Sequence, residues 1–584
     1  MASPSFSPLD RIAASSRLSA GVLLMVAGLL LIPGLADLPL MDRDEPRFAQ
    51  ATWEMREQGQ WWVPYFNREY RFDKPPLTYW WMELHYLLFG RNEFAARLHS
   101  VLAAWLVACV IRSLGSFLYS PRAGFLAGLG WLSFFQVLVH GRLCVADMPM
   151  LLAVTLTMLA SARLLFPSEA PRRFGPWFWA LTGALTLGFL AKGPVAWAVP
   201  MLGLLLTRWG WWRKPLPWKR LQPVSAILIA TAAVGIWGVP ALAQTEGAFW
   251  QVGIGEHVVK RGTSAFNGRV TIPVVFYLVS AFLSLLPWSH FAPAALFQGT
   301  RGRDDLRRSF LLGWFVAPFL VFGLYATQLP HYIMPGFPAF ALLLFRKGTL
   351  PAISGKLGRS WFWAVTGVLG VVSLAFGIVA LRLPWPEEMS QFRTLGVVIS
   401  LGLLAASVVA PLVLKKQAGL VPGLPALTGW IALLVGVSCC FAIGGKAIRS
   451  MHPAVKLTEQ FWSELPPETK FRACEFTEPS LVFYRPSGGV GWKMGGHIEK
   501  AHEWFARPTS KRAGVYLLRE WTASDALEHW WTEKTFAGVL PGRDSSAEVE
   551  AGIDEARYET HTFRGYNVAR SSWVELLVLF PKSG

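Results

Sequence analysis

Residues 20–38 read AGVLLMVAGLLLIPGLADL, and residues 41–50, which follow almost directly, read MDRDEPRFAQ. The first stretch is apolar over the roughly 20 residues that a helix needs to cross a bilayer. The second stretch is polar and rich in charge. Long apolar runs separated by short charged segments recur over the first 450 residues. This alternation predicts a polytopic α-helical membrane protein.

The composition also favours a membrane protein over a large soluble one. Hydrophobic residues make up 53% of the 584 residues, charged residues make up 16%, and the mean hydropathy is +0.37. Globular proteins carry about 25% charged residues. The net charge of +18 comes mostly from short loops between apolar runs, which indicates topology signals and argues against a nucleic-acid partner. The five cysteines have no zinc-ligand spacing, so no metal cluster is predicted.

Thirteen membrane spans are predicted. Arg11 and Arg17 precede the first run, as in a signal peptide, but the run is long and lacks a clean cleavage site, so we interpret it as an uncleaved span. The apolar stretch Leu77–Phe89 is too short for a span and is interpreted as a juxtamembrane helix. The spans are predicted near residues 20–38, 94–118, 121–140, 147–166, 176–191, 194–208, 222–243, 271–297, 308–326, 331–346, 360–382, 395–414 and 426–446.

The loop charges sort by side under this assignment. With a cytoplasmic N-terminus, every strongly basic short loop lies inside, as the positive-inside rule requires. The odd number of spans places the tail outside, and its charged, mixed pattern predicts a small α/β soluble domain. The chain then divides into a transmembrane part, residues 1–449, with an outer loop at 41–93, and an extracytoplasmic domain, residues 450–584.

Polar side chains gather on the outer side of this topology. Charged groups at membrane depth are costly and tend to be functional. Lysine and arginine can hold a phosphate headgroup. A carboxylate can take a proton from an attacking hydroxyl or stabilise positive charge on a sugar ring. The candidates are Asp44, Glu45, Lys74, Arg142, Asp147, Lys192, His257, His331 and Tyr332.

Each candidate also has a structural alternative. Asp44 and Glu45 could form a solvated pair, and Lys74 could be an interfacial lysine. Asp147 could cap the helix that follows it, and Lys192 could close the end of another. The two histidines could be structural, and the tyrosine could belong to the aromatic belt. The shared side of the membrane, found independently from the loop charges, favours a functional set.

Several short motifs follow one another along the chain, and both their residues and their order are informative. Met41–Gln50 contains Asp-Arg-Asp-Glu-Pro-Arg, and Phe72–Trp80 reads Phe-Asp-Lys-Pro-Pro-Leu-Thr-Tyr-Trp. The later motifs are Asn92–Arg97, Arg142–Pro149, Leu190–Pro194, Leu286–Trp288, Leu329–Pro335 and Glu475–Tyr484. In this order they resemble the bacterial 4-amino-4-deoxy-L-arabinose transferases, which belong with the protein O-mannosyltransferases in the GT-C class of glycosyltransferases. The resemblance covers most of the chain.

The resemblance implies a fold and an activity. It implies a GT-C fold in the bacterial inner membrane, with the active site and the tail on the periplasmic side. The implied donor is a sugar on a polyprenyl phosphate such as undecaprenyl phosphate, and the implied acceptor is a lipid A-like lipid or another envelope glycan. Transfer with inversion at the anomeric carbon is the expectation for the class. No cofactor is certain, and a divalent metal stays open.

The resemblance also implies roles for the site residues. Asp44 would be the key catalytic carboxylate, with Glu45 beside it and Asp147 as the second acidic residue. Lys74 and Lys192 would bind donor or acceptor phosphate. Tyr332 would line the same cavity, and Arg142, His257 and His331 complete the candidate phosphate-binding set.

Two departures leave the acceptor open. Gln328 stands where the arabinose transferases carry a lysine, and His331 stands where a smaller residue is common. Transfer to protein, as in the O-mannosyltransferases, is an alternative. A transporter or flippase of a lipid-linked sugar is another, although it predicts polar residues on the inner half and is commonly built from repeats, which this chain lacks. A third is a non-catalytic envelope protein that binds through its tail.

Overall fold

The computed structural model describes most of the 584 residues. The residues outside the description are 1–6, 168, 170, 210–215, 265–271, 298–305, 352, 354, 383–392, 395, 403, 405–422, 463–464, 466–468, 486–492, 508–511, 523–524, 526–540 and 583–584.

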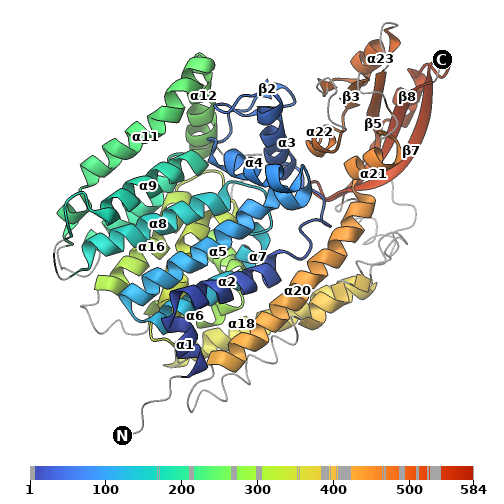
Figure 1. The fold of residues 1–584 in the computed structure, drawn as a ribbon. Coiled ribbons are helices and arrows are strands. Elements are labelled where there is room, and N and C mark those ends of the chain that lie inside the picture. The colour runs from blue at the N-terminus through green and yellow to red at the C-terminus, as the bar shows by residue number, and fades with distance from the viewer. Residues whose placement is uncertain are drawn as a thin grey trace.

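A bundle of long helices makes up the first three quarters of the chain (Figure 1). Its main helices are α2 (Ser16–Leu31), α5 (Glu93–Leu118), α6 (Pro121–Leu132), α8 (Asp147–Leu165), α9 (Pro176–Lys192), α10 (Val195–Trp209), α11 (Pro223–Gln244), α14 (Pro273–Ser284), α16 (Leu306–Gly323), α17 (Phe337–Phe345), α18 (Gly355–Arg382) and α20 (Gly423–Met451). Shorter segments are α1 (Pro8–Ala14), α7 (Phe135–His140), η1 (Trp218–Leu221), η4 (Trp288–Phe291), α15 (Ala292–Phe297) and η5 (Pro330–Gly336).

The described part of the chain contains fewer full-length apolar helices than the thirteen spans that the sequence predicts. Within the described residues, six helices are long and apolar enough to cross a membrane, and two bent pairs raise this number to eight. Helices nevertheless occupy twelve of the thirteen predicted ranges, while most of the range 395–414 lies outside the described residues. The difference arises because several runs fold as short or broken helices, such as α6 with α7. A multi-pass helical membrane protein follows, and the number thirteen stays a prediction.

Small residues let neighbouring helices approach closely. A Cβ atom added to Gly124 of α6 would lie 2.2 Å from the carbonyl oxygen of Arg112 in α5. One added to Gly313 of α16 would lie 2.6 Å from the carbonyl oxygen of Gly203 in α10. Small residues at helix crossings are typical of membrane bundles, where packing replaces the hydrophobic effect as the driving force.

A layer of short elements covers one end of the bundle (Figure 1). It contains α3 (Asp44–Glu57), a hairpin of β1 (Tyr65–Phe66) and β2 (Glu69–Tyr70), and α4 (Leu77–Phe89). The predicted short helix over Leu77–Phe89 is confirmed as a helix with these bounds. Its 13 residues reach about 20 Å, which is short of the roughly 30 Å hydrocarbon core. The loop after α11 adds α12 (Ala248–Trp250), the π-helix η2 (Gln251–Lys260) and α13 (Arg261–Thr263).

A mixed sheet lies beyond α20 and α21 (Pro453–Gln460), next to this layer (Figure 1). The strand order is β4-β3-β5-β8-β7, and β6 pairs with β5. Strand β3 is parallel to β4 and β5, whereas β8 is antiparallel to β5 and β7. The strands are β3 (Lys470–Cys474), β4 (Lys493–Met494), β5 (Arg512–Thr522), β6 (Arg543–Asp544), β7 (Tyr558–Asn567) and β8 (Ser572–Pro581), and the helices are α22 (Ser480–Tyr484), α23 (Ile498–Ala506) and α25 (Ser546–Ala551).

Candidate active site

A cavity of about 600 Å³ is lined partly by residues of the outer layer, Phe72–Pro75 and residues of α12 and η2. Its walls are mostly apolar and come from α9, α10, α11 and η2. The polar side chains that line it include Asp73, Lys74, Asp147, Lys192, His257, His331 and Tyr332. Six of the nine candidates from the sequence therefore share one cavity, although they come from segments up to 258 positions apart.

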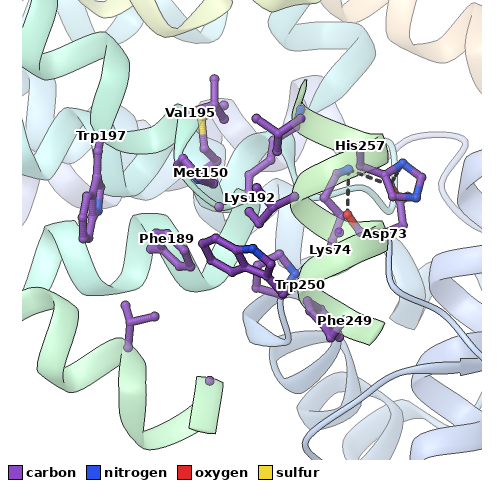
Figure 2. Close-up of a pocket in the computed structure, with 18 of the residues that line it drawn as sticks. Asp73, Lys74, Met150, Phe189, Lys192, Val195, Trp197, Phe249, Trp250 and His257 are labelled. Atoms are coloured by element: carbon purple, nitrogen blue, oxygen red, sulfur yellow. Dashed lines mark hydrogen bonds and ion pairs between the residues drawn. The ribbon is translucent and has the colours of Figure 1, made fainter. Parts of the chain in front are cut away.

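One polar corner of the cavity is built by the loop before α4 and by η2 (Figure 2). Asp73 Oδ1 lies 2.7 Å from Lys74 Nζ and 3.4 Å from His257 Nδ1. Arg71 donates to the other oxygen of Asp73 at 2.8 Å. Burial alone would raise the pKa of Asp73, but the charges of Lys74 and Arg71 outweigh it and hold that pKa well below its usual range. Asp73 is therefore a carboxylate that pairs with Lys74.

A second polar group forms where α8 begins and α9 ends. Lys192 Nζ lies 2.6 Å from Asp147 Oδ1, and His331 Nε2 lies 3.6 Å from the same oxygen. The Lys192 ammonium also lies 5.8 Å from the ring centre of Tyr332, within cation–π range. Gly193, with φ of 73°, ends α9 directly after Lys192. A cation at a helix C-terminus and an anion at a helix N-terminus are both favourable, so the helix ends support the pair.

Asp147 is the first residue of α8, and the cap position is held by Ala146. Asp147 therefore does not cap this helix, in contrast to the structural alternative given above. Its side chain turns instead to the lysine and histidine of the cavity. Behind this histidine lies a second one, His140, with ring centres 4.5 Å apart.

Asp44 and Glu45 lie side by side in sequence but in different environments. Asp44 is exposed at the start of α3, and its charge acts on Arg71, the partner of Asp73. Glu45 is buried and accepts two hydrogen bonds from Arg97, at 2.9 and 2.7 Å. Burial would raise the pKa of Glu45, but Arg97 holds it below its usual range. Neither Asp44 nor Glu45 is among the residues that line the cavity; Asp44 acts on its corner through Arg71, whereas Glu45 supports the loop from within.

Arg142 is not brought to the cavity. Its guanidinium is buried and donates to the backbone carbonyl groups of Leu138, Leu30 and Pro33. These carbonyl groups lie at the ends of α2 and α7, so Arg142 joins two helix ends. A role in packing accounts for these contacts.

Sequence reasoning did not single out Asp73 and Arg71. Asp73 directly precedes Lys74 in the quoted motif, and a carboxylate beside a lysine at membrane depth was an available signal. The π-helix that carries His257 had no sequence signal, although π-helical turns frequently occur at functional sites. Among the described residues, no group of three or more His, Cys, Asp or Glu side chains is arranged to hold a metal ion.

Residues 73–237, which include Lys74, Asp147 and Lys192, match the family described as dolichyl-phosphate-mannose-protein mannosyltransferase. The undecaprenyl phosphate-alpha-4-amino-4-deoxy-L-arabinose arabinosyl transferase of Edwardsiella ictaluri is 33% identical over 353 residues, 59% of this chain and 62% of that protein. The transferase of the same name from Yersinia pestis is 30% identical over 347 residues, 58% of this chain and 60% of that protein. The match thus spans about 60% of the length of these curated relatives.

The likeness extends to solved structures. The crystal structure of ArnT from Cupriavidus metallidurans bound to undecaprenyl phosphate matches with a TM-score of 0.70 and 19% identity, over 96% of this chain and 97% of that chain. The apo structure of the same protein matches with a TM-score of 0.67 and 21% identity, over 88% and 94%. This chain has the ArnT fold. The resemblance stated from the motifs is confirmed, and this fold agrees with the polytopic helical membrane protein that the apolar runs predicted.

Proposed function

We propose that this chain is an integral-membrane glycosyltransferase that moves a sugar from a polyprenyl-phosphate donor to an acceptor in the cell envelope. One observation carries the proposal: Lys74 and Lys192 reach the same cavity, each paired with its own carboxylate. Two cations at the end of an apolar cavity suit a phosphate group on a long apolar lipid. The relatives named for undecaprenyl phosphate-linked arabinose support this donor class.

The carboxylates explain how the cavity holds two lysines whose side chains are only 16% and 15% exposed. A phosphate group that binds must compete with Asp73 and Asp147 for them. Asp73 would keep Arg71 and His257 as partners, and Asp147 would keep His331. Neither carboxylate would be left without a partner, which lowers the cost of the exchange because an unpaired buried charge is expensive.

The proposed reaction breaks the bond between the anomeric carbon and the donor phosphate oxygen. A new bond forms between that carbon and an acceptor oxygen that attacks from the opposite face, so the configuration inverts. The lysines stabilise the negative charge left on the phosphate. When the acceptor is a hydroxyl group, its proton passes to the Asp44 carboxylate, whereas a phosphate acceptor has no proton to lose.

We further propose how the chain lies in the membrane. Thirteen segments cross the bacterial inner membrane, and residues 1–449 form the transmembrane part. Residues 450–584 form an extracytoplasmic domain beside the outer loop 41–93, and the polar end of the cavity faces the periplasm. The position of α3, α4, α12 and the C-terminal sheet at one end of the bundle (Figure 1) supports this arrangement, as do the basic loops assigned to the cytoplasm.

The proposed acceptor is a lipid A-like lipid or another envelope glycan, and lipid mass spectrometry decides between them. Envelope extracts from cells with and without the protein are compared. We expect one lipid or glycan species to lose a single sugar increment when the protein is absent. Wild-type protein restores it, while Asp44→Asn and Lys74→Ala do not. Identical extracts, or full restoration by both variants, would contradict the proposal.

A further inference from the structure

The motif Glu475–Tyr484 belongs to the C-terminal part of the chain, yet it touches the loop that carries Asp44. The motif contains α22, which packs against α3 (Figure 1). Phe483 of α22 is buried in the same cluster of apolar side chains as Phe48 of α3 and Met82 of α4. The two regions are therefore in direct contact although about 440 positions separate them in the sequence.

One part of this contact is a pair of hydrogen bonds to a single carboxyl group. Ser480 donates to Asp42 twice, from its backbone nitrogen to Oδ1 at 2.8 Å and from its hydroxyl to Oδ2 at 2.6 Å. Ser480 is fully buried, and the Asp42 side chain is only 5% exposed. His452 Nε2 lies 3.8 Å from the same carboxyl group. When each oxygen of a carboxyl group accepts one hydrogen bond, the orientation of the side chain is fixed as well as its position.

A second set of contacts holds the residues just before Asp42. The Tyr484 hydroxyl accepts from the backbone nitrogen of Leu40 at 2.9 Å and donates to Glu93 at 3.0 Å. Arg91 donates to the backbone carbonyl of Phe483, and its guanidinium lies 4.7 Å from the centre of that ring. The C-terminal motif therefore holds residues 40–42 from one side.

The bundle holds the same segment from the other side. Glu45 accepts from the backbone nitrogen atoms of Met41 and Cys144, each at 2.8 Å, and is paired with Arg97. Asp44 lies between Asp42 and Glu45, the residues held by these two sets of contacts, and is exposed, as is Arg43. Its carboxyl group is thus placed by contacts that its neighbours make.

We propose that Ser480 and Asp42 are positioning residues, through which the C-terminal motif fixes the start of α3 and the Asp44 carboxylate relative to the cavity. This role rests on the transfer reaction proposed above, in which Asp44 acts on the acceptor. The lysines that would hold the donor phosphate lie on other segments. A loosened Asp44 should therefore lower the rate of transfer while donor binding is kept.

Steady-state transfer by the full-length protein in membranes tests this role with Ser480→Ala, Asp42→Ala and Asp42→Asn. Ser572→Ala is the matched control, because Ser572 is also fully buried and also donates to a carboxylate, Glu520, but lies within the C-terminal sheet. We expect Ser480→Ala and Asp42→Ala to lower kcat about tenfold, the effect of losing one buried hydrogen bond, with KM for the donor unchanged. Asp42→Asn can still accept from the Ser480 backbone nitrogen with its Oδ1 and can donate from its Nδ2 to the Ser480 hydroxyl oxygen, so it should keep kcat.

Hydrogen exchange of the backbone amides at residues 40–48 gives a readout that does not depend on activity. We expect faster exchange there in Ser480→Ala and unchanged exchange in Ser572→Ala. Unchanged kcat and exchange in Ser480→Ala would overturn the positioning role, as would an equal loss of kcat in Ser572→Ala. If the wild-type protein transfers no sugar at all, the proposed function fails, and the exchange data still decide whether the contact holds the loop.

Discussion

The pair formed by Lys192 and Asp147 permits a quantitative test of the cavity. Their side chains are 15% and 9% exposed, and the nitrogen and oxygen atoms lie 2.6 Å apart. Removing one partner of a buried pair costs about 3–5 kcal/mol because the other charge is left unpaired. His331 stays near Asp147 and part of the lysine reaches solvent, so we expect Lys192→Met and Asp147→Asn to cost about 3 kcal/mol and about 2 kcal/mol.

The double variant leaves no unpaired charge and should cost less than the sum of the two single changes. We expect a coupling free energy of about 2–3 kcal/mol in a double-mutant cycle, the upper part of the range for contacting residues. The assay is the free energy of unfolding of the purified protein in detergent by denaturant titration. Arg564 and Glu575, which lie 3.4 Å apart in the C-terminal sheet with the arginine 67% exposed, form the control pair; their coupling should stay below about 1 kcal/mol. Single effects at Lys192 and Asp147 that add within about 0.5 kcal/mol would refute the reasoning.

Three further predictions concern the support of the site. Burial raises the pKa of Asp42 to about 7 from 3.8; since the folded value is the higher one, its contribution to stability is present below about pH 4 and lost as the pH rises to about 7. Asp42→Asn stays neutral, so its Tm relative to that of the wild type should rise from pH 5 to pH 8. The groups that face residue 42, namely His452, Glu478 and Arg47, are the same in both proteins. A Tm difference that does not change with pH would argue against this. Glu45→Gln should cost about 3–5 kcal/mol of stability by leaving Arg97 without its partner, and it should also lower the kcat of the folded fraction because Glu45 holds Met41 near Asp44; a variant of unchanged stability and kcat would argue against this role. The two cavity lysines should neutralise the donor phosphate without a divalent ion, so transfer should be unchanged in EDTA; a loss that Mg²⁺ or Mn²⁺ restores would show a metal requirement.

The multi-pass helical architecture could be predicted from the sequence because hydropathy acts over long windows. The short helix Leu77–Phe89 was placed with its bounds, since its length excluded a span. The breaks in helices such as α14 with η4 and α15 were not foreseen. Such a break depends on local backbone geometry and neighbouring contacts, which an apolar run does not encode.

The cavity was predictable in part for a similar reason. Lys74, Asp147 and Lys192 stand out because charge at membrane depth is costly. Arg142 carried the same signal, but its charge is satisfied by backbone carbonyl groups at helix ends. Whether a buried charge meets a ligand or a carbonyl group depends on tertiary contacts. The Asp42–Ser480 contact could not be found from the sequence either, because it joins distant segments.

The most direct test of the central claim is the fate of the donor lipid. Purified full-length protein in proteoliposomes is given a polyprenyl-phosphate sugar and an envelope lipid extract, and both lipids are followed by mass spectrometry. The account predicts that free polyprenyl phosphate appears in equal amount with the glycosylated acceptor, and that Lys74→Ala and Asp44→Asn suppress both products. Donor that stays intact, or that only crosses the bilayer, would contradict the account.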